Sequence, residues 1–229
     1  MAIIKPFTAL RPQQQLSQQV ASRPYDVLNS EEAKTEAAGN PFSFLHVTKS
    51  EIDLPAGIDI HSQEVYDKAK ENLQQFIANG ILFKEEKPSY YIYQLVMKGR
   101  SQTGLVCVSS VDDYFKNTIK KHEFTRPEKE KDRIEHMTTI RAQTGNVFLA
   151  YRDVETVNTI IHNWKYTYQP VYNFTATDGI QHAIWVVNDQ SVIDDITSQF
   201  QVNVPFTYIA DGHHRAASAA KVSKSLPDS

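Results

Sequence analysis

Hydrophobic residues recur at helical spacing in some stretches of this chain and alternate with polar residues in others. The clearest helical stripe follows Ser62, where an apolar face ends at Asn79-Gly80 and consists of Val65, Ala69, Leu73, Phe76 and Ile77. Residues that recur every three or four positions fall on one face of a helix, so this stripe predicts a helix packed on a core.

The same criteria, with start and stop signals, predict further helices. Asn29-Ser30 provides a cap for a helix over 31–38, which Gly39 and Pro41 end, and Pro127 suits the first turn of another. The remaining predicted helices cover 111–121, 127–137, 154–164, 192–200 and the residues from 213 onward.

Alternating or apolar runs predict the strands. We expect hairpins of 89–97 with 104–110 across 98–103, and of 171–176 with 180–187 across Thr177-Asp178-Gly179. Single strands are expected at 42–47, 146–151 and 204–209. Cross-strand packing accounts for Tyr90, Tyr91 and Tyr93 more economically than a stacking platform does.

Hairpins mixed with crossovers predict an α+β fold with mixed sheets and flanking helices. No linker composition marks a boundary, but a division near residue 110 would give an N-terminal α+β region, 1–110, and a second region, 111–229.

Composition narrows the class of protein. The 229 residues are 41% hydrophobic and 22% charged, as in soluble globular proteins, and the net charge of −3 argues against a general binder of nucleic acid or anionic membranes. No apolar run approaches the length of a membrane span, so we expect a cytoplasmic protein. The single cysteine, Cys107, lies in an apolar run and is expected to be a buried hydrophobe rather than a nucleophile.

The candidate chemistry lies where an apolar strand ends in Asp211-Gly212-His213-His214-Arg215 and an alanine-rich helix begins. Free backbone N–H groups and the positive end of the helix dipole suit a phosphate or another anion. The dipole contributes only about 0.3–1 kcal/mol at an exposed site, so Arg215 would have to add a charge-assisted bond. The alternative is an ordinary turn with solvated histidines.

A second group of charges lies between two predicted helices. In this loop Glu123 could act as a general base, Arg126 and Arg133 as anion clamps, and His122 as a proton carrier. A functional loop and a solvated loop both stay open as interpretations. Charges of alternating sign over 128–133 are typical of a solvated helix face.

The residues of the Asp-Gly-His-His-Arg turn favour magnesium over zinc. His213 and His214 are adjacent, so on a helix they point about 100° apart and do not favour zinc. Magnesium carried in by the phosphates of ADP or ATP and touched by Asp211 fits better. We expect no zinc, haem or flavin, and the sequence contains neither a nucleophile elbow nor a Gly-rich phosphate loop.

Three motifs together resemble a family of bacterial and archaeal proteins, the domain of unknown function 1015 family. They are Ala21–Val27 with Asn40-Pro41, Lys121–Pro127 through Asp132-Arg133, and Ala210–Arg215. The resemblance covers essentially the whole chain. Arg23 departs from the proline that is common at this position in the family.

The Asp-Gly-His-His-Arg turn also resembles the phosphate-binding turn of the ParB and sulfiredoxin superfamily, which includes a free-serine kinase. That resemblance implies a ParB/sulfiredoxin-like element in the C-terminal half and a phosphotransferase acting on serine. It implies Asp211, Glu123 and His214 as catalytic residues, and Arg126 and His122 as substrate-binding residues. Phosphate would be bound by Gly212, His213, His214 and Arg215.

Two other functions stay open. The chain could be a non-catalytic module that senses a nucleotide or phosphoserine in the serine pathway, or a ParB-like nucleic-acid protein, which the acidic balance disfavours. The stretch Lys221–Ser229 follows the last predicted helix without a further strand. We therefore expect the rest of a longer chain, or an oligomer partner, to complete the site.

Overall fold

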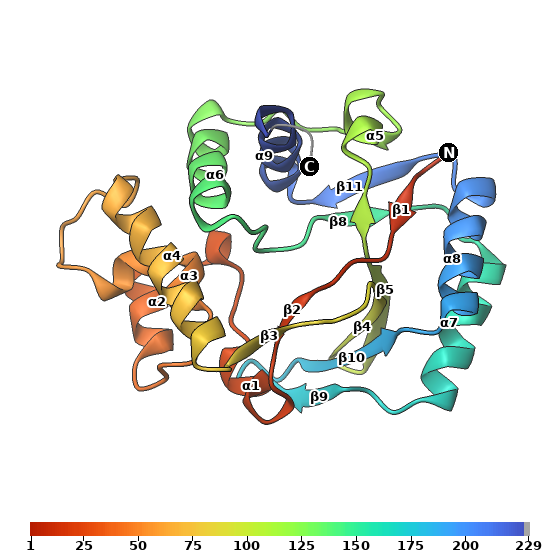
Figure 1. Cartoon of the computed structure of the whole chain (residues 1–229), viewed down its shortest axis with the longest axis horizontal. Helices are drawn as coiled ribbons and strands as arrows, with labels where there is room; N and C mark the ends of the chain where they lie inside the picture. The colour runs from red at the N-terminus through yellow and green to blue at the C-terminus, as the bar shows by residue number, and fades with distance from the viewer. Residues whose placement is uncertain (227–229) are drawn as a thin grey trace. The chain divides into compact units, whose positions relative to one another are not determined.

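In the computed structural model, which describes residues 1–226, the chain forms two compact units, each assembled from separate stretches of sequence (Figure 1). Unit 1 comprises Met1–Gln14, Lys84–His122 and Leu149–Ala210, and unit 2 comprises Gln15–Phe83, Glu123–Phe148 and Asp211 to the C-terminus. Both units therefore draw on residues from each side of position 110. The last three residues of the expected tail lie outside the described part.

The main sheet of unit 1 is antiparallel, with strand order β5-β4-β10-β9. These strands are β4 (Tyr90–Met97), β5 (Arg100–Val106), β9 (Tyr172–Thr175) and β10 (Gln181–Val187). Both expected hairpins are confirmed. The first is tighter than predicted, because only Lys98 and Gly99, with φ of 50° and 79°, connect its strands. Two consecutive positive φ angles are the signature of a two-residue hairpin turn.

Two amphipathic helices, α7 (Glu155–Thr167) and α8 (Gln190–Asn203), share the core of unit 1 with this sheet. Trp185 and Val187 from β10 and Ile196 and Phe200 from α8 are among its buried residues. Cys107 packs against the same core, and burial raises the pKa of its thiol to about 12. Cys107 is thus a partly buried residue that packs against the core, as its apolar run predicts, although it is not fully buried.

Shorter elements complete unit 1. They are β1 (Ile4–Lys5), β2 (Leu10–Pro12), β6 (Val108–Ser109), α5 (Val111–Phe115), β7 (Ile119–Lys120), β8 (Phe148–Ala150) and β11 (Thr207–Asp211). The strand β11 lies between β7 and β8. The helix expected over 111–121 is wrong beyond Phe115. Asn117 adopts a φ of 59° there, which a right-handed helix cannot contain.

Unit 2 is mainly helical. Its helices are α1 (Ser17–Val20), α2 (Ser30–Ala37), α3 (Leu45–Thr48), α4 (Gln63–Ala78), α6 (Pro127–Ile140) and α9 (His213–Ser225). Single 3-10 turns, η1 (Gln14–Leu16), η2 (Tyr25–Val27) and η3 (Ser50–Asp53), lie between elements, and β3 (Leu82–Lys84) runs from unit 2 into unit 1.

Some of the elements predicted for unit 2 are confirmed, and one is wrong. Asn29 and Glu32 form a reciprocal capping box at α2, as its cap residues indicate. The predicted stripe of α4 is buried except for Ile77, which is 46% exposed. The strand expected over 42–47 is wrong: Leu45 and Val47 are fully buried on α3, and a short apolar run suits either element.

The antiparallel main sheet of unit 1 and the mainly helical unit 2 are consistent with the α+β class. No helix within residues 1–226 combines the length and apolarity needed to cross a bilayer.

Candidate functional site

The first turn of α9 leaves its backbone N–H groups open. Gly212 precedes the helix with φ +93°, a conformation that glycine adopts without steric cost. No side-chain hydrogen bond caps this end of the helix within residues 1–226, so the N–H groups of His214 and Arg215 are available to a ligand or to water. The predicted helix start is confirmed.

The predicted loop lies against this turn through both histidines. The carboxylate of Glu123 is 3.3 Å from Nδ1 of His213, and the backbone N–H of Arg126 donates to Nε2 of His214 at 3.0 Å. His213 is buried, whereas Glu123 is 62% exposed. The structure therefore brings the Glu123–Arg126 loop together with the Asp-Gly-His-His-Arg turn inside unit 2.

Arg215 is held by three segments of unit 2. Its Nη2 is 2.6 Å from the Asp211 carboxylate and 3.3 Å from that of Asp26, and its Nη1 donates to the carbonyl of Asn146. The side chain is only 11% exposed, and its Nε is buried without a hydrogen-bond partner among residues 1–226. Arg215 thus links the start of α9 to two distant segments, while the Asp211 carboxylate stays 68% exposed.

Asp26 is a site residue that sequence reasoning missed. It lies in η2, and its contact with Arg215 spans 189 positions in the sequence. Its motif, Arg23-Pro24-Tyr25-Asp26, was one of the three that carried the family resemblance. The motif identified the segment, but only the tertiary structure shows what the carboxylate contacts.

The neighbouring Tyr25 packs on a second arginine. The guanidinium of Arg133 lies 4.0 Å from the centre of the Tyr25 ring, and its Nη2 is 2.6 Å from the Asp132 carboxylate. Asp132 also accepts a hydrogen bond from Tyr66 at 2.9 Å and lies 3.0 Å from Nδ1 of His61. The guanidinium of Arg133 is therefore held between the Tyr25 ring of η2 and the Asp132 carboxylate.

This arrangement corrects the solvated face expected over 128–133. Asp132 and Arg133 are mostly covered, and Glu130 is only 5% exposed. Glu130 bonds to Thr125 and to Lys221 of α9. Burial favours a raised pKa for Glu130, but the hydrogen bonds from Lys221 and Thr125 outweigh it and lower the pKa. Some of the charged residues over 128–133 are therefore buried, because α9 packs on α6.

His122 and Phe124 border the loop. His122 is exposed and belongs to unit 1, whereas the contacts described above lie within unit 2. Phe124 is 99% exposed.

The charges at the site are mixed. Asp26, Asp211 and Glu123 provide carboxylates, against the cations Arg126 and Arg215, and the Arg126 side chain forms no ion pair within residues 1–226. The structure shows no group of three or more His, Cys, Asp or Glu side chains arranged to hold a metal ion in that same range. Asp211 is the exposed carboxylate next to the open N–H groups, so it is the residue that could contact a cation brought by a ligand.

Fold and site define an α+β protein with an open helix start facing a charged loop. The chain belongs to the family described as Protein of unknown function (DUF1015), whose model matches residues 4–228. No curated protein and no solved structure matches it. The resemblance of the turn to the ParB and sulfiredoxin superfamily stays a prediction.

Proposed function

We propose that this chain is a phosphotransferase-like protein that binds the phosphoryl group of a nucleotide at the first turn of α9 and passes it to a small hydroxyl compound, with serine as the first candidate. The observation that carries the proposal is the uncapped start of α9 with the Glu123–Arg126 loop bonded to its two histidines. Such a reaction fits the cytoplasmic location expected from the sequence.

Backbone N–H groups from Gly212 to Arg215 would hold the phosphoryl oxygens, because a helix start binds anions through these groups and its dipole. Phosphoryl transfer depends mainly on positioning and charge stabilisation. The bond from Arg215 to Asp211, next to Gly212, supports such positioning.

The exposed side chains suggest the other roles. Glu123 would accept the proton of the hydroxyl substrate, and Arg126 would pair with a substrate carboxylate. His214 keeps the loop in place through its bond to the Arg126 amide. The three carboxylates at the site would repel a bare nucleotide, so we expect ADP or ATP to enter with magnesium, which Asp211 would contact.

The test is to incubate the chain with serine, magnesium and either ADP or ATP, and to detect phosphoserine by ³¹P NMR. The variants are Asp211→Asn and Glu123→Gln. Matched controls are Asp195→Asn on α8 and Glu86→Gln, which are exposed and have no ion pair within residues 1–226. Circular dichroism checks that each variant is folded.

We expect each site variant to lose on the order of 10² or more in rate, as removal of a positioned acid or base does, and each control to match wild type. If wild type forms no phosphoserine and binds neither nucleotide by calorimetry, the proposal is wrong. Nucleotide or phosphoserine binding without turnover would instead support the sensing module. Salt-sensitive DNA binding would support the nucleic-acid alternative.

A further inference from the structure

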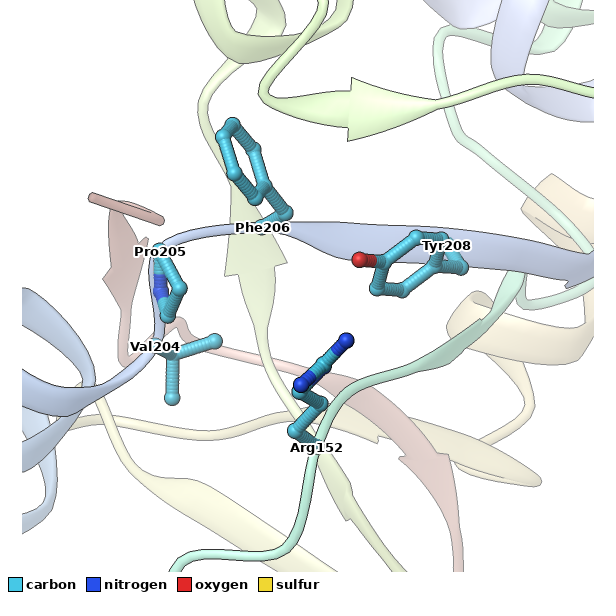
Figure 2. Close-up of a pocket in the computed structure, with 5 residues that line it drawn as sticks. All are labelled: Arg152, Val204, Pro205, Phe206 and Tyr208. Carbon is cyan, nitrogen blue, oxygen red and sulfur yellow. The ribbon is translucent and has the colours of Figure 1, made fainter.

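Unit 1 contains a pocket of about 240 Å³ at the start of β11. It is lined by Arg152, Val204, Pro205, Phe206 and Tyr208 (Figure 2). We propose that this pocket binds a flat aromatic ring that carries an anionic group, such as an aryl carboxylate or a nucleoside monophosphate. This inference is independent of the proposed function, because none of the lining residues belongs to the site at α9.

The alternation of β11 accounts for the aromatic lining. Thr207 and Ile209 are buried, whereas Phe206 and Tyr208 are 42% and 39% exposed. In the parallel pairing with β7, Tyr208 is opposite Lys120. The rings of Phe206 and Tyr208, at the start of β11, are therefore partly exposed, with Lys120 on the adjacent strand β7.

The cations at this pocket lack carboxylate partners. Arg152 forms no ion pair or hydrogen bond within residues 1–226, and the neighbouring Asp153 accepts instead from Asn158 at 2.5 Å. The ammonium of Lys120 lies 4.0 Å from the centre of the Phe206 ring, and it has no ion pair in that same range either. In a chain of net charge −3, two unpaired cations beside one pocket favour an anionic ligand.

The geometry of the side chains suits a ring that bears the charge at one end. Figure 2 shows the Arg152 guanidinium and the Tyr208 hydroxyl both pointing into the space beside Val204 and Pro205. A guanidinium binds a carboxylate or phosphate through two parallel N–H bonds, and the phenol can donate a third. Pro205 and Phe206 would then contact the ring, since aromatic faces stack on such surfaces.

The volume limits the size of this ligand. Sites for drug-sized ligands occupy roughly 300–1,000 Å³, so a pocket of about 240 Å³ takes one ring system with its anionic group. Benzoate and AMP each combine an aromatic ring with an anionic group. They represent the two classes of ligand, aryl carboxylates and nucleoside monophosphates. Acetate lacks the ring and adenosine lacks the charge, so these two compounds test each half of the proposal.

The experiment is an NMR titration of the ¹⁵N-labelled chain with benzoate, AMP, acetate and adenosine in turn. We expect benzoate or AMP to shift the amide signals of residues 152, 204 and 206–208 with a dissociation constant that weakens about tenfold or more in Arg152→Gln. Arg100→Gln, an exposed arginine on β5 without an ion pair in the described chain, is the matched control and should bind like wild type.

Tyr208→Phe provides a second variant that keeps the aromatic ring on the exposed face, and it should weaken binding by removing only the hydroxyl. The proposal is overturned if neither benzoate nor AMP shifts these signals at millimolar concentration, or if Arg152→Gln binds them as wild type does. Equal binding of acetate would overturn the role of the ring, and equal binding of adenosine that of the charge. AMP shifts confined to residues 212–215 would show that AMP binds at the site at α9. That result would count against AMP as a ligand of this pocket.

Discussion

The carboxylate of Asp26 lies 3.3 Å from Nη2 of Arg215, although 189 positions separate the two residues in the sequence. The same guanidinium nitrogen bonds to Asp211, and the neighbouring Nη1 bonds to the carbonyl of Asn146. One side chain at the start of α9 therefore joins η2, the segment before β8 and the end of β11. We expect this connection to hold the turn at Gly212 in place.

Replacing Arg215 should destabilise unit 2. In Arg215→Gln the carboxylates of Asp26 and Asp211 lose their common partner, and we expect the free energy of unfolding to fall by about 2 kcal/mol. Asp26→Asn should cost about 1 kcal/mol, because that carboxylate is 36% exposed and Asp211 keeps its own bond. Urea unfolding measures both values, with Lys70→Gln, an exposed change on α4, as the control.

A double-mutant cycle isolates the pair itself. The double variant Asp26→Asn/Arg215→Gln should be less destabilised than the sum of the single variants by about 0.5–1 kcal/mol, since residues in contact are not additive. Strict additivity would show that this ion pair contributes nothing to stability.

A side chain at Gly212 should destabilise the protein. A Cβ there would lie 3.2 Å from Cζ and from Nε of Arg215, and the φ of +93° is itself unfavourable for alanine. Gly39→Ala is the matched control in unit 2, because Gly39 also has a positive φ, +73°, but no atom within 4 Å of the added Cβ.

We expect Gly39→Ala to cost about 1 kcal/mol, the backbone penalty alone, and Gly212→Ala to cost about 1 kcal/mol more. Urea unfolding again gives the values. Equal losses in the two variants would mean that Arg215 moves aside without cost and does not hold the turn.

The sequence predicted the elements whose signals are local. The capping box of Asn29 and Glu32, the apolar stripe of α4 and the hairpin turn at Asp178-Gly179 each act within a few residues. The failures depend on tertiary packing or on one unusual torsion. Leu45 and Val47 form a helix because their segment is buried between others, and Asn117 ends α5 through a positive φ.

In the candidate site, too, local signals identified residues, but they did not show which residues are in contact. The turn at Asp211–Arg215 and the loop at Glu123–Arg126 were both identified from residue types, and the contact of His214 with Arg126 joins them. Asp26 and Asn146 carry no chemical signal that distinguishes them from other surface residues. The charge pattern of its own helix predicts that Glu130 is exposed to solvent. That pattern does not reveal the bonds of Glu130 to Lys221 and Thr125.

Acid should destabilise unit 2 through His136. This side chain is 3% exposed, bonds through Nε2 to the Val47 carbonyl at 3.0 Å, and its pKa is lowered to about 4 by burial and by the charge of Arg133. Asp132 and Glu51 oppose that shift. The unfolded chain has an ordinary histidine pKa near 6.5, so it binds more protons than the folded chain between these two values.

Stability should therefore be fully present above about pH 6.5 and fall as the pH decreases toward 4, by about 3 kcal/mol in total. His136→Gln removes this proton-linked loss but not that of the carboxylates. The difference in unfolding free energy between wild type and variant, measured by urea unfolding from pH 7 to pH 4, should shrink or reverse. A difference that does not change with pH would show that His136 is not held neutral by burial.

The bond between the Arg126 amide and His214 Nε2 should control the mobility of the loop that carries Glu123. In His214→Ala this amide loses its acceptor, and a net hydrogen-bond contribution of about 1–1.5 kcal/mol corresponds to roughly tenfold faster hydrogen exchange. The Glu130 amide, which donates to the Arg126 carbonyl within the first turn of α6, is the internal reference and should exchange at its wild-type rate. His162→Ala on α7, an exposed histidine of unit 1, is the matched control and should leave both amides unchanged. Faster exchange at both amides would indicate general loss of stability, whereas no change at Arg126 would mean that the loop is held by Glu123 and His213 alone.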